Sequence, residues 1–235
     1  MTGKQKEGIF RYLADWSEER KLTWLLAALI IDTVIVYPFV SVVESRVAIQ
    51  IINGVIISVI LLLGLVALTR RKISRRVLGA VVVTVISIHF VRLVFGANWL
   101  MGWEISLSLV TVIIFVYLIM RYVYSEGTVT RQRIRGAVAA YLLIAIAFAV
   151  GYHLTSFLMP GAFTFPDKVP NLDDPQFIYF SVTTITTLGY GDIIPVHPFA
   201  RTLVMMEALI GQLYPAILLA RLVSLYVLHS QRSHK

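Results

Sequence analysis

Six long apolar stretches dominate the sequence and limit what it can fold into. Each is close to the roughly 20 apolar residues that an α-helix needs to cross a bilayer. Because unpaired backbone groups find no partner in lipid, such stretches cross it as helices. We therefore predict an all-α, polytopic membrane protein. The expected spans are 22–43, 47–69, 77–97, 105–124, 135–158 and 199–229.

Composition supports a membrane location. Of the 235 residues, 58% are hydrophobic and 14% are charged, whereas a soluble domain carries about 25% charged residues. The chain has no cysteine, which excludes disulfides, thiolate metal sites and cysteine nucleophiles. We expect no enzyme activity and no cofactor.

The basic residues predict the orientation of the chain. The formal net charge is +8, and the segments 70–76 and 121–135 hold five and four basic residues, whereas 159–198 holds only Lys168. The positive-inside rule then places both termini and the basic loops in the cytoplasm. We interpret the positive charge as this orientation signal, with attraction to anionic lipid headgroups in the cell membrane, rather than as nucleic-acid binding.

The expected parts of the chain follow from these spans. Ile9, Leu13 and Trp16 share one helical face, so the N-terminal segment is predicted to lie on the cytoplasmic leaflet, with an ordinary solvated helix as the alternative. The parts are an interfacial helix (1–21), a four-helix membrane domain (22–124), a cytoplasmic linker (125–134), a last domain (135–230) and a short cytoplasmic tail (231–235).

One irregular segment lies between the last two spans. A short helix is predicted over 174–185, with Asp174 as N-cap and Pro175 in the first helical position. It is too short to cross the bilayer, so it enters and stops partway, and the chain returns through 187–195. Non-helical backbone at membrane depth is tolerated where it is buried in protein or lines a polar pathway. We expect this loop to line such a pathway.

The residues of the loop favour a cation in that pathway. Gly189 and Gly191 tolerate backbone angles closed to other residues, so successive carbonyls can point the same way, and Thr187 adds a hydroxyl oxygen. Oxygen ligands without a carboxylate among them suit a weakly held monovalent cation. The negative C-terminal end of the short helix favours the same charge.

The stretch "TTLGYGD", residues 186–192, resembles the selectivity filter of the potassium-channel superfamily. Pro195, Arg201 and Gly211 follow at the spacing of that family. The resemblance covers about 135–230, and this segment is similar to the pore module of bacterial two-span channels. It would comprise an outer helix (135–158), a pore helix (174–185), a filter (187–191) and an inner helix (199–229).

The resemblance implies a K⁺-selective homotetramer with one filter loop per chain. Carbonyls of Thr187, Leu188, Gly189 and Tyr190, with the Thr187 hydroxyl, would hold K⁺, and Gly191 would complete the filter. Leu188 replaces the commoner valine or isoleucine. Tyr179 and Phe180 replace paired tryptophans, and Thr183 stands where some members carry glutamate. The residues expected to support the filter are Thr186, Asp192, Tyr179, Thr183 and Glu207.

Two residues of the last span predict a bend. Gly211 weakens the helix, and Pro215 removes the backbone hydrogen bond to residue 211. We interpret the pair as a gating hinge, with a static kink as the alternative. Polar residues at membrane depth face the bundle interior, so Glu207 is expected behind the filter.

The first four spans lack the pattern of a voltage sensor. The stretch "ISLSLVTVIIFVYLIM" (105–120), which makes up most of the fourth span, carries no basic residue, so strong voltage gating is not expected. Asp32 and Arg92 lie deep in the first and third spans, and we predict that they form an ion pair within the bundle.

Three other functions fit parts of the sequence. The first is a weakly selective or silent cation pore, and the second is a membrane sensor or assembly subunit that keeps the pore fold. The third is an intramembrane aspartyl protease, because "GYGD" (189–192) matches the Gly-x-Gly-Asp pattern of that class, with Asp32 as the second aspartate.

Overall fold

The computed structural model describes residues 21–36, 45–69, 72–125, 130–165 and 176–233. The predicted interfacial helix, 1–21, lies almost wholly outside the described residues. Residues 21–30 are α-helical and continue as the π-helical segment η1 (Ile31–Val36). The remaining elements are α3 (Arg46–Leu68), α4 (Lys72–Phe95), the 3₁₀ segment η2 (Asn98–Leu100), α5 (Met101–Val123), α6 (Arg131–Leu158), β1 (Phe163–Thr164), α7 (Gln176–Ile185), β2 (Ile194–Pro195) and α8 (Pro198–Ser233).

Five helices in the described residues are long and apolar enough to cross a membrane. They are α3, α4, α5, α6 and α8. The predicted all-α, polytopic fold is therefore confirmed. The first predicted span is helical over 22–36, and residues 37–43 lie outside the described part of the chain.

The helices start earlier than hydropathy alone predicted. α4 begins at Lys72 rather than at residue 77, and α6 begins at Arg131 rather than at residue 135. Thr130 caps α6 by accepting a hydrogen bond from the backbone N–H of Arg133. Arg131 and Arg133 thus belong to the first turn of a helix and not to the predicted linker. Hydropathy marks the apolar part of a span, whereas hydrogen-bonded turns continue into the headgroup region.

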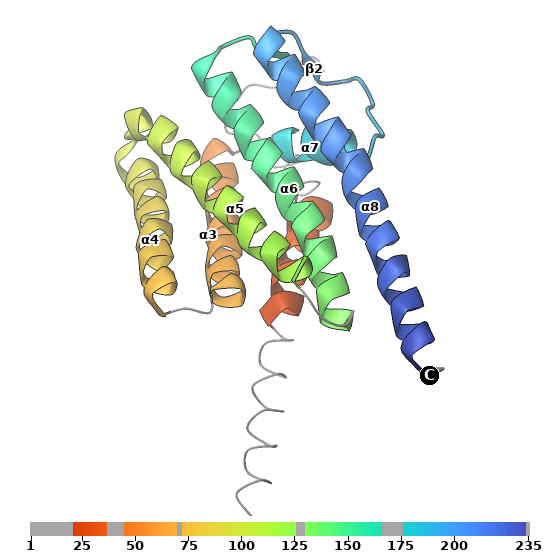
Figure 1. The fold of residues 1–235 in the computed structure, drawn as a ribbon. Helices are drawn as coiled ribbons and strands as arrows, with labels where there is room; N and C mark the ends of the chain where they lie inside the picture. The colour runs from red at the N-terminus through yellow and green to blue at the C-terminus, as the bar shows by residue number, and fades with distance from the viewer. Residues whose placement is uncertain (1–20, 37–44, 70–71, 126–129, 166–175, 234–235) are drawn as a thin grey trace, which may run out of the picture.

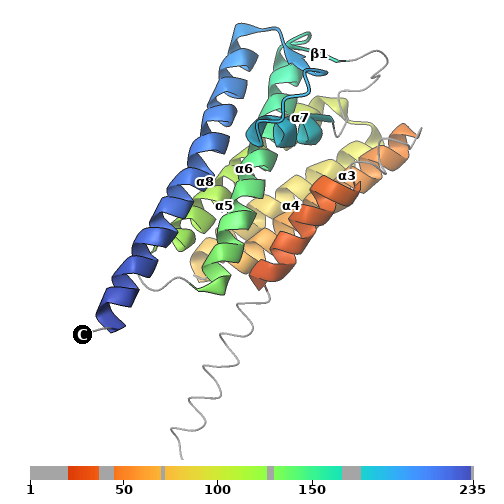
Figure 2. The ribbon, with the colours of Figure 1, turned by 90° about the vertical axis from the view of Figure 1, so that its right-hand side faces the viewer.

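The chain passes up and down through the bundle (Figures 1 and 2). The start of α4, the start of α6 and the C-terminal end of α8 lie at one end of the molecule, whereas η2, β1 and β2 lie at the other. The starts of α4 and α6, which carry basic residues, thus lie at the same end.

The short helix α7 lies between α6 and α8, near the end that carries the strands (Figure 1). The strands β1 and β2 pair antiparallel, with Phe163 opposite Pro195, and close the loop that contains α7. Arg201 donates a hydrogen bond from Nε to the Pro195 carbonyl at 3.1 Å, which fixes the start of α8 to this strand pair.

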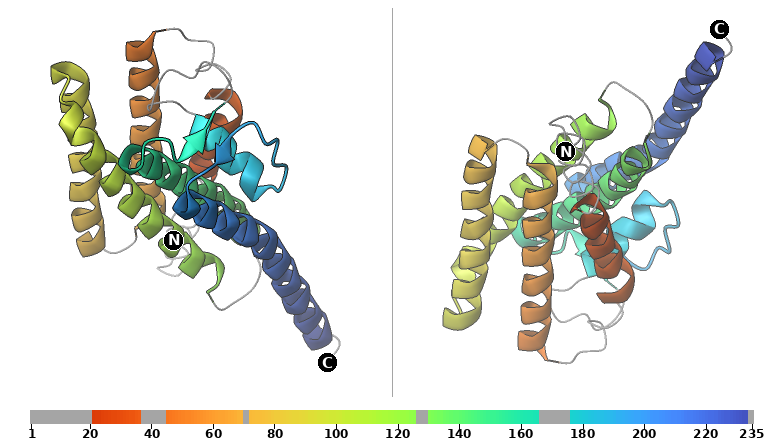
Figure 3. Two further views of the ribbon diagram at one scale, coloured as in Figure 1. Left: turned by 90° about the horizontal axis from the view of Figure 1, so that it is seen from above. Right: turned by 90° about the horizontal axis from the view of Figure 1, so that it is seen from below.

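Two apolar cores hold the helices together. The larger core joins α3, α4, α5 and α6, and its fully buried members include Leu61, Val82, Phe115 and Leu143. The smaller core lies behind α7 and is aromatic, with Tyr152 at its centre. α8 packs on α6 and α7 through its upper part, Arg221 joins it further down to the end of α5, and its C-terminal end extends away from the bundle (Figure 3).

Candidate functional site

The loop after α7 carries an alternating backbone conformation. Positive φ angles occur at Thr187 (62°), Gly189 (49°) and Gly191 (78°), that is, at every second residue. When left-handed residues alternate with ordinary ones, successive carbonyls turn toward the same side of the chain. The sequence indicated glycine freedom at 189 and 191, but it carried no signal that Thr187, a β-branched residue, is also left-handed.

The start of this loop is anchored to the last turn of α7. The Thr183 carbonyl accepts hydrogen bonds from the N–H groups of Leu188 (2.8 Å) and Gly189 (3.0 Å), and the Thr184 carbonyl accepts one from Thr187 (2.9 Å). The hydroxyl of Thr186 bonds back to the Val182 carbonyl at 2.6 Å. These bonds offset the cost of the left-handed conformation at Thr187.

The far end of the loop is braced by a side chain of α7. Tyr179 donates a hydrogen bond from its hydroxyl to Asp192 Oδ2 at 2.8 Å, and its ring stacks on that of Tyr190 with centroids 6.3 Å apart. Asp192 also accepts a hydrogen bond from the N–H of Ile193 at 3.0 Å. The loop is therefore held at both ends by one short helix.

Behind α7, a buried carboxyl group connects three helices. Glu207 of α8 accepts hydrogen bonds from Tyr152 of α6 and from Ser181 of α7, and all three residues are fully buried. The sequence placed Glu207 behind the loop but did not single out Tyr152 or Ser181 as its partners.

A second tyrosine of α6 supports the same helix. Tyr141 donates a hydrogen bond to the Ile185 carbonyl, at the C-terminal end of α7, over 2.8 Å. Tyr141 and Tyr152 are separated by about three helical turns, so they lie on one face of α6. The spacing of these two tyrosines in an apolar helix was the feature of the sequence that could have indicated that both support α7.

Gly211 lies where α8 crosses the end of α7. A Cβ at this position would be 2.1 Å from the Ile185 carbonyl oxygen, so only glycine permits this approach. α8 continues as a helix through Pro215 to Ser233. The position predicted as a hinge is thus also a packing contact, and bending there would change how α8 meets α7.

The predicted ion pair between Asp32 and Arg92 does not form. Arg92 instead pairs with Glu104, with 2.8 Å between Nε and Oε2, and His89 Nδ1 lies 2.6 Å from Glu104 Oε1. Glu104 opens α5 just after the 3₁₀ turn that follows α4, which brings its carboxylate to the last turn of α4. That proximity depends on the path of this turn, which hydropathy does not reveal.

The two aspartates of the protease hypothesis belong to different sites. Asp192 is exposed in the loop and is bonded to Tyr179, whereas Asp32 is buried in the first helix. Asp32 lines a cavity whose walls do not include Asp192. A shared proton between the two carboxyl groups has no support in this arrangement.

The comparisons with known proteins concern the same part of the chain. Residues 139–227 match the family described as "Ion channel". An inward rectifier potassium channel, Kirbac3.1 of Paramagnetospirillum magnetotacticum, is 37% identical over 81 residues, which are 33% of this chain and 24% of that protein. Two pore potassium channel c of Oryza sativa subsp. japonica is 36% identical over 91 residues, 39% of this chain and 19% of that protein.

Over residues 139–227 the chain is thus similar to members of the potassium-channel superfamily. It spans about a quarter or less of the length of these two curated relatives. No solved structure matches it significantly. The similarity covers α6, α7, the loop and α8, and leaves the helices from 21 to 123 outside the match.

Proposed function

We propose that this protein is a K⁺-selective channel subunit whose filter is residues 187–191. The observation that carries the proposal is the alternation of left-handed backbone at Thr187, Gly189 and Gly191, held at one end by the Thr183 carbonyl and at the other by Tyr179. The carbonyl oxygens of Thr187, Leu188, Gly189 and Tyr190, with the Thr187 hydroxyl, would replace the water around K⁺.

The position of α7 supports a cation at the inner end of this loop. The last carbonyls of a helix carry partial negative charge. α7 ends at Ile185, two residues before Thr187, so this charge is placed next to the first expected ion ligands. No cofactor is needed for this function, and K⁺ itself is the transported ion.

A homotetramer follows from the proposal, because one loop supplies only one side of a filter. The exposed side chains are consistent with this assembly. Leu188 and Tyr190 are 59% and 68% exposed in the single chain. α8 also presents an exposed apolar row with one residue per helical turn, formed by Met205, Leu209, Leu213 and Ile217.

We place the protein in the cell membrane with both termini and the basic ends of α4 and α6 in the cytoplasm. This orientation rests on the positive-inside rule. The strand pair and the mouth of the filter, near Asp192, then face outside. The basic residues at the inner surface would attract anionic lipid headgroups.

Opening is not expected to depend strongly on voltage. Each charge that crosses the field contributes about 2.3 kcal/mol per 100 mV, and α5 carries one basic residue, Arg121, in its last turn. Gly211 and Pro215 remain our candidates for the hinge of the gate. Gly211 at the contact with α7 would link a bend in α8 to the filter.

The test is the reversal potential of purified protein in planar bilayers with K⁺ on one side and Na⁺ on the other. We expect the potential to approach that of a K⁺ electrode, and we expect Gly189→Ala to abolish this selectivity, because residue 189 has a φ angle of 49°. Equal permeability to both ions in the unaltered protein would instead identify a weakly selective pore. No current under any tested condition would favour a sensor or assembly subunit. A steep conductance–voltage curve would contradict the voltage prediction alone.

A further inference from the structure

A cavity of about 130 Å³ lies between the peripheral helices and the back of α7. Its walls come from η1, α3, α4, α5, α6 and α7, and Phe177 and Ile178 form the part contributed by α7. Most of the lining is aliphatic, but charged and polar groups are concentrated within it, among them Asp32, His89, Arg92 and Glu104. Such groups are rare inside a membrane protein and usually mark a functional site.

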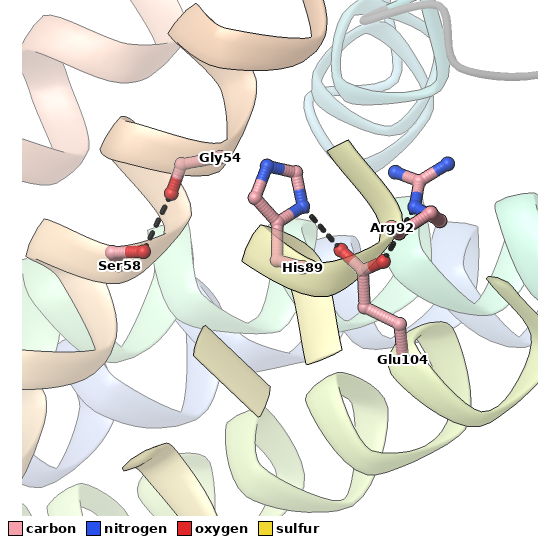
Figure 4. A network of polar contacts seen from close by, with 5 residues as sticks. All are labelled: Gly54, Ser58, His89, Arg92 and Glu104. Carbon is pink, nitrogen blue, oxygen red and sulfur yellow. Dashed lines mark hydrogen bonds and ion pairs between the residues drawn. The ribbon is translucent and has the colours of Figure 1, made fainter. Parts of the chain in front are cut away.

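The charges on one side of this cavity are balanced. Glu104 lies between His89 Nδ1 at 2.6 Å and Arg92 Nε at 2.8 Å (Figure 4). His89 is fixed against α3, because a Cβ on Gly54 would lie 1.8 Å from its Nε2 atom. At the same place on α3, the hydroxyl of Ser58 donates a hydrogen bond to the Gly54 carbonyl at 2.6 Å. Arg92 and Glu104 therefore neutralise each other within a fixed arrangement.

The charge of Asp32 is not balanced. The residue is 6% exposed and lines the cavity, yet among the described residues it has neither a hydrogen-bond partner nor an ion-pair partner. It also lies in the π-helical segment Ile31–Val36. π-Helical turns are rare in proteins overall, and those that occur are often found at functional sites. A buried carboxylate is costly unless a positive group accompanies it. Asp32 would therefore stabilise a cationic group bound in this cavity.

We propose that the cavity binds a small amphipathic organic amine, with its ammonium group on Asp32 and its apolar body against the aliphatic walls. The volume of the cavity is comparable to that of an engineered apolar cavity of about 150 Å³ that binds benzene. An ammonium group donates charge-assisted hydrogen bonds to a carboxylate. The occupant would touch Phe177 and Ile178, so it would act on the back of the pore helix without entering the pore.

The test is the binding of benzylamine to the full chain in lipid nanodiscs at neutral pH, measured by isothermal titration. Benzyl alcohol is the matched uncharged probe. We expect benzylamine to bind the unaltered protein. Benzyl alcohol should bind at least about tenfold more weakly, because benzyl alcohol lacks the positive charge. Asp32→Asn should reduce benzylamine binding to the level of benzyl alcohol, and Asp32→Glu should retain part of it. Thr33→Val, which leaves the cavity charge unchanged, should bind benzylamine as the unaltered protein does.

Two results would overturn the proposal. One is equal affinity for benzylamine and benzyl alcohol, which would show that the cavity binds apolar groups without recognising the ammonium charge. The other is benzylamine binding that survives Asp32→Asn, which would place the amine elsewhere, for instance in the pore.

A cysteine measurement keeps the proposal testable if the Asp32 variants fail to fold. The chain has no cysteine, so Ser108→Cys places a single thiol in the cavity wall. Its reaction with 2-aminoethyl methanethiosulfonate, followed by mass spectrometry, should be slowed by benzylamine and not by benzyl alcohol. Val196→Cys, in the exposed loop after β2, is the control and should react at the same rate with or without benzylamine. Absence of protection at residue 108 would contradict the proposed site.

Discussion

Ser181 on α7 donates a hydrogen bond to the carboxyl group of Glu207 on α8, at a point where both residues are fully buried. The same carboxyl group accepts a hydrogen bond from Tyr152 on α6. One side chain of α8 thus positions the helix that carries the proposed filter. Ser181 Oγ also lies 2.6 Å from the Ala145 carbonyl oxygen of α6, so all three helices meet at this point.

Replacing this carboxyl group should weaken the support of the filter. Glu207→Ala leaves the Tyr152 hydroxyl without its acceptor, whereas Ser181 keeps the Ala145 carbonyl, and a buried unsatisfied group costs about 1–3 kcal/mol. We expect a lower melting temperature in detergent and a loss of K⁺ selectivity, with a smaller effect for Glu207→Gln because the amide still accepts a hydrogen bond. Thr202→Ala is the control, because that exposed hydroxyl bonds only to a carbonyl of its own helix. Equal melting temperatures for Glu207→Ala and the control would contradict this role.

Adding one methyl group to α8 should separate it from α7. In Gly211→Ala, the new Cβ would lie 2.1 Å from the Ile185 carbonyl oxygen, and backbone on both sides has little freedom to move. Overpacking of this kind costs about 1–3 kcal/mol, so we expect a lower melting temperature and altered conduction.

The matched control for this change is Gly151→Ala in α6. Nothing lies within 4 Å of a Cβ at that position. Alanine is favoured over glycine inside a helix by about 0.5–1 kcal/mol, so Gly151→Ala should leave the melting temperature unchanged or raise it. A Gly211→Ala protein as stable as Gly151→Ala would show that the two helices do not approach each other as described.

The brace at the outer end of the loop depends on one hydroxyl. Tyr179→Phe removes the 2.8 Å hydrogen bond to Asp192 but keeps the ring that stacks on Tyr190. A net loss of about 0.5–1.5 kcal/mol is typical of one hydrogen bond. We expect K⁺ currents that decline faster during sustained recording, with an unchanged reversal potential while the channel is open. Tyr117→Phe, on the exposed face of α5, should behave like the unaltered protein, and a matching decline in that variant would refute the brace.

The lower part of α8 is attached to the end of α5 by one arginine. Arg221 Nη2 donates hydrogen bonds to the carbonyls of Tyr124 (2.9 Å) and Ser125 (3.1 Å), and its guanidinium group lies 4.7 Å from the centroid of the Tyr124 ring. The C-terminal carbonyls of α5 are thereby capped from another helix.

Arg221→Lys should loosen this attachment, because lysine lacks the planar group that spans two carbonyls and stacks on a ring. We expect a changed open probability in single-channel recordings with the same K⁺ selectivity. Arg121→Lys is the control, since Arg121 lies 5.8 Å from the centroid of the exposed Tyr117 ring. If both variants open like the unaltered protein, the contact between α5 and α8 does not influence the gate.

The helices and the loop can be predicted from the amino-acid sequence, because both depend on local chemistry. Twenty apolar residues in a row need no distant partner to become a spanning helix. Gly189 and Gly191 permit positive φ angles wherever they stand. The pore helix likewise follows from the residues of one short segment.

Which polar groups meet inside the bundle depends instead on how the helices pack. Asp32 and Arg92 looked like partners because both are charged and deep, yet Glu104, placed beside α4 by a 3₁₀ turn, holds the arginine. Tyr152 and Ser181 converge on Glu207 from separate helices, and Gly211 meets Ile185 because α8 crosses α7. Hydropathy does not encode how each helix is rotated and crossed, since those angles are set by the packing of all the helices together.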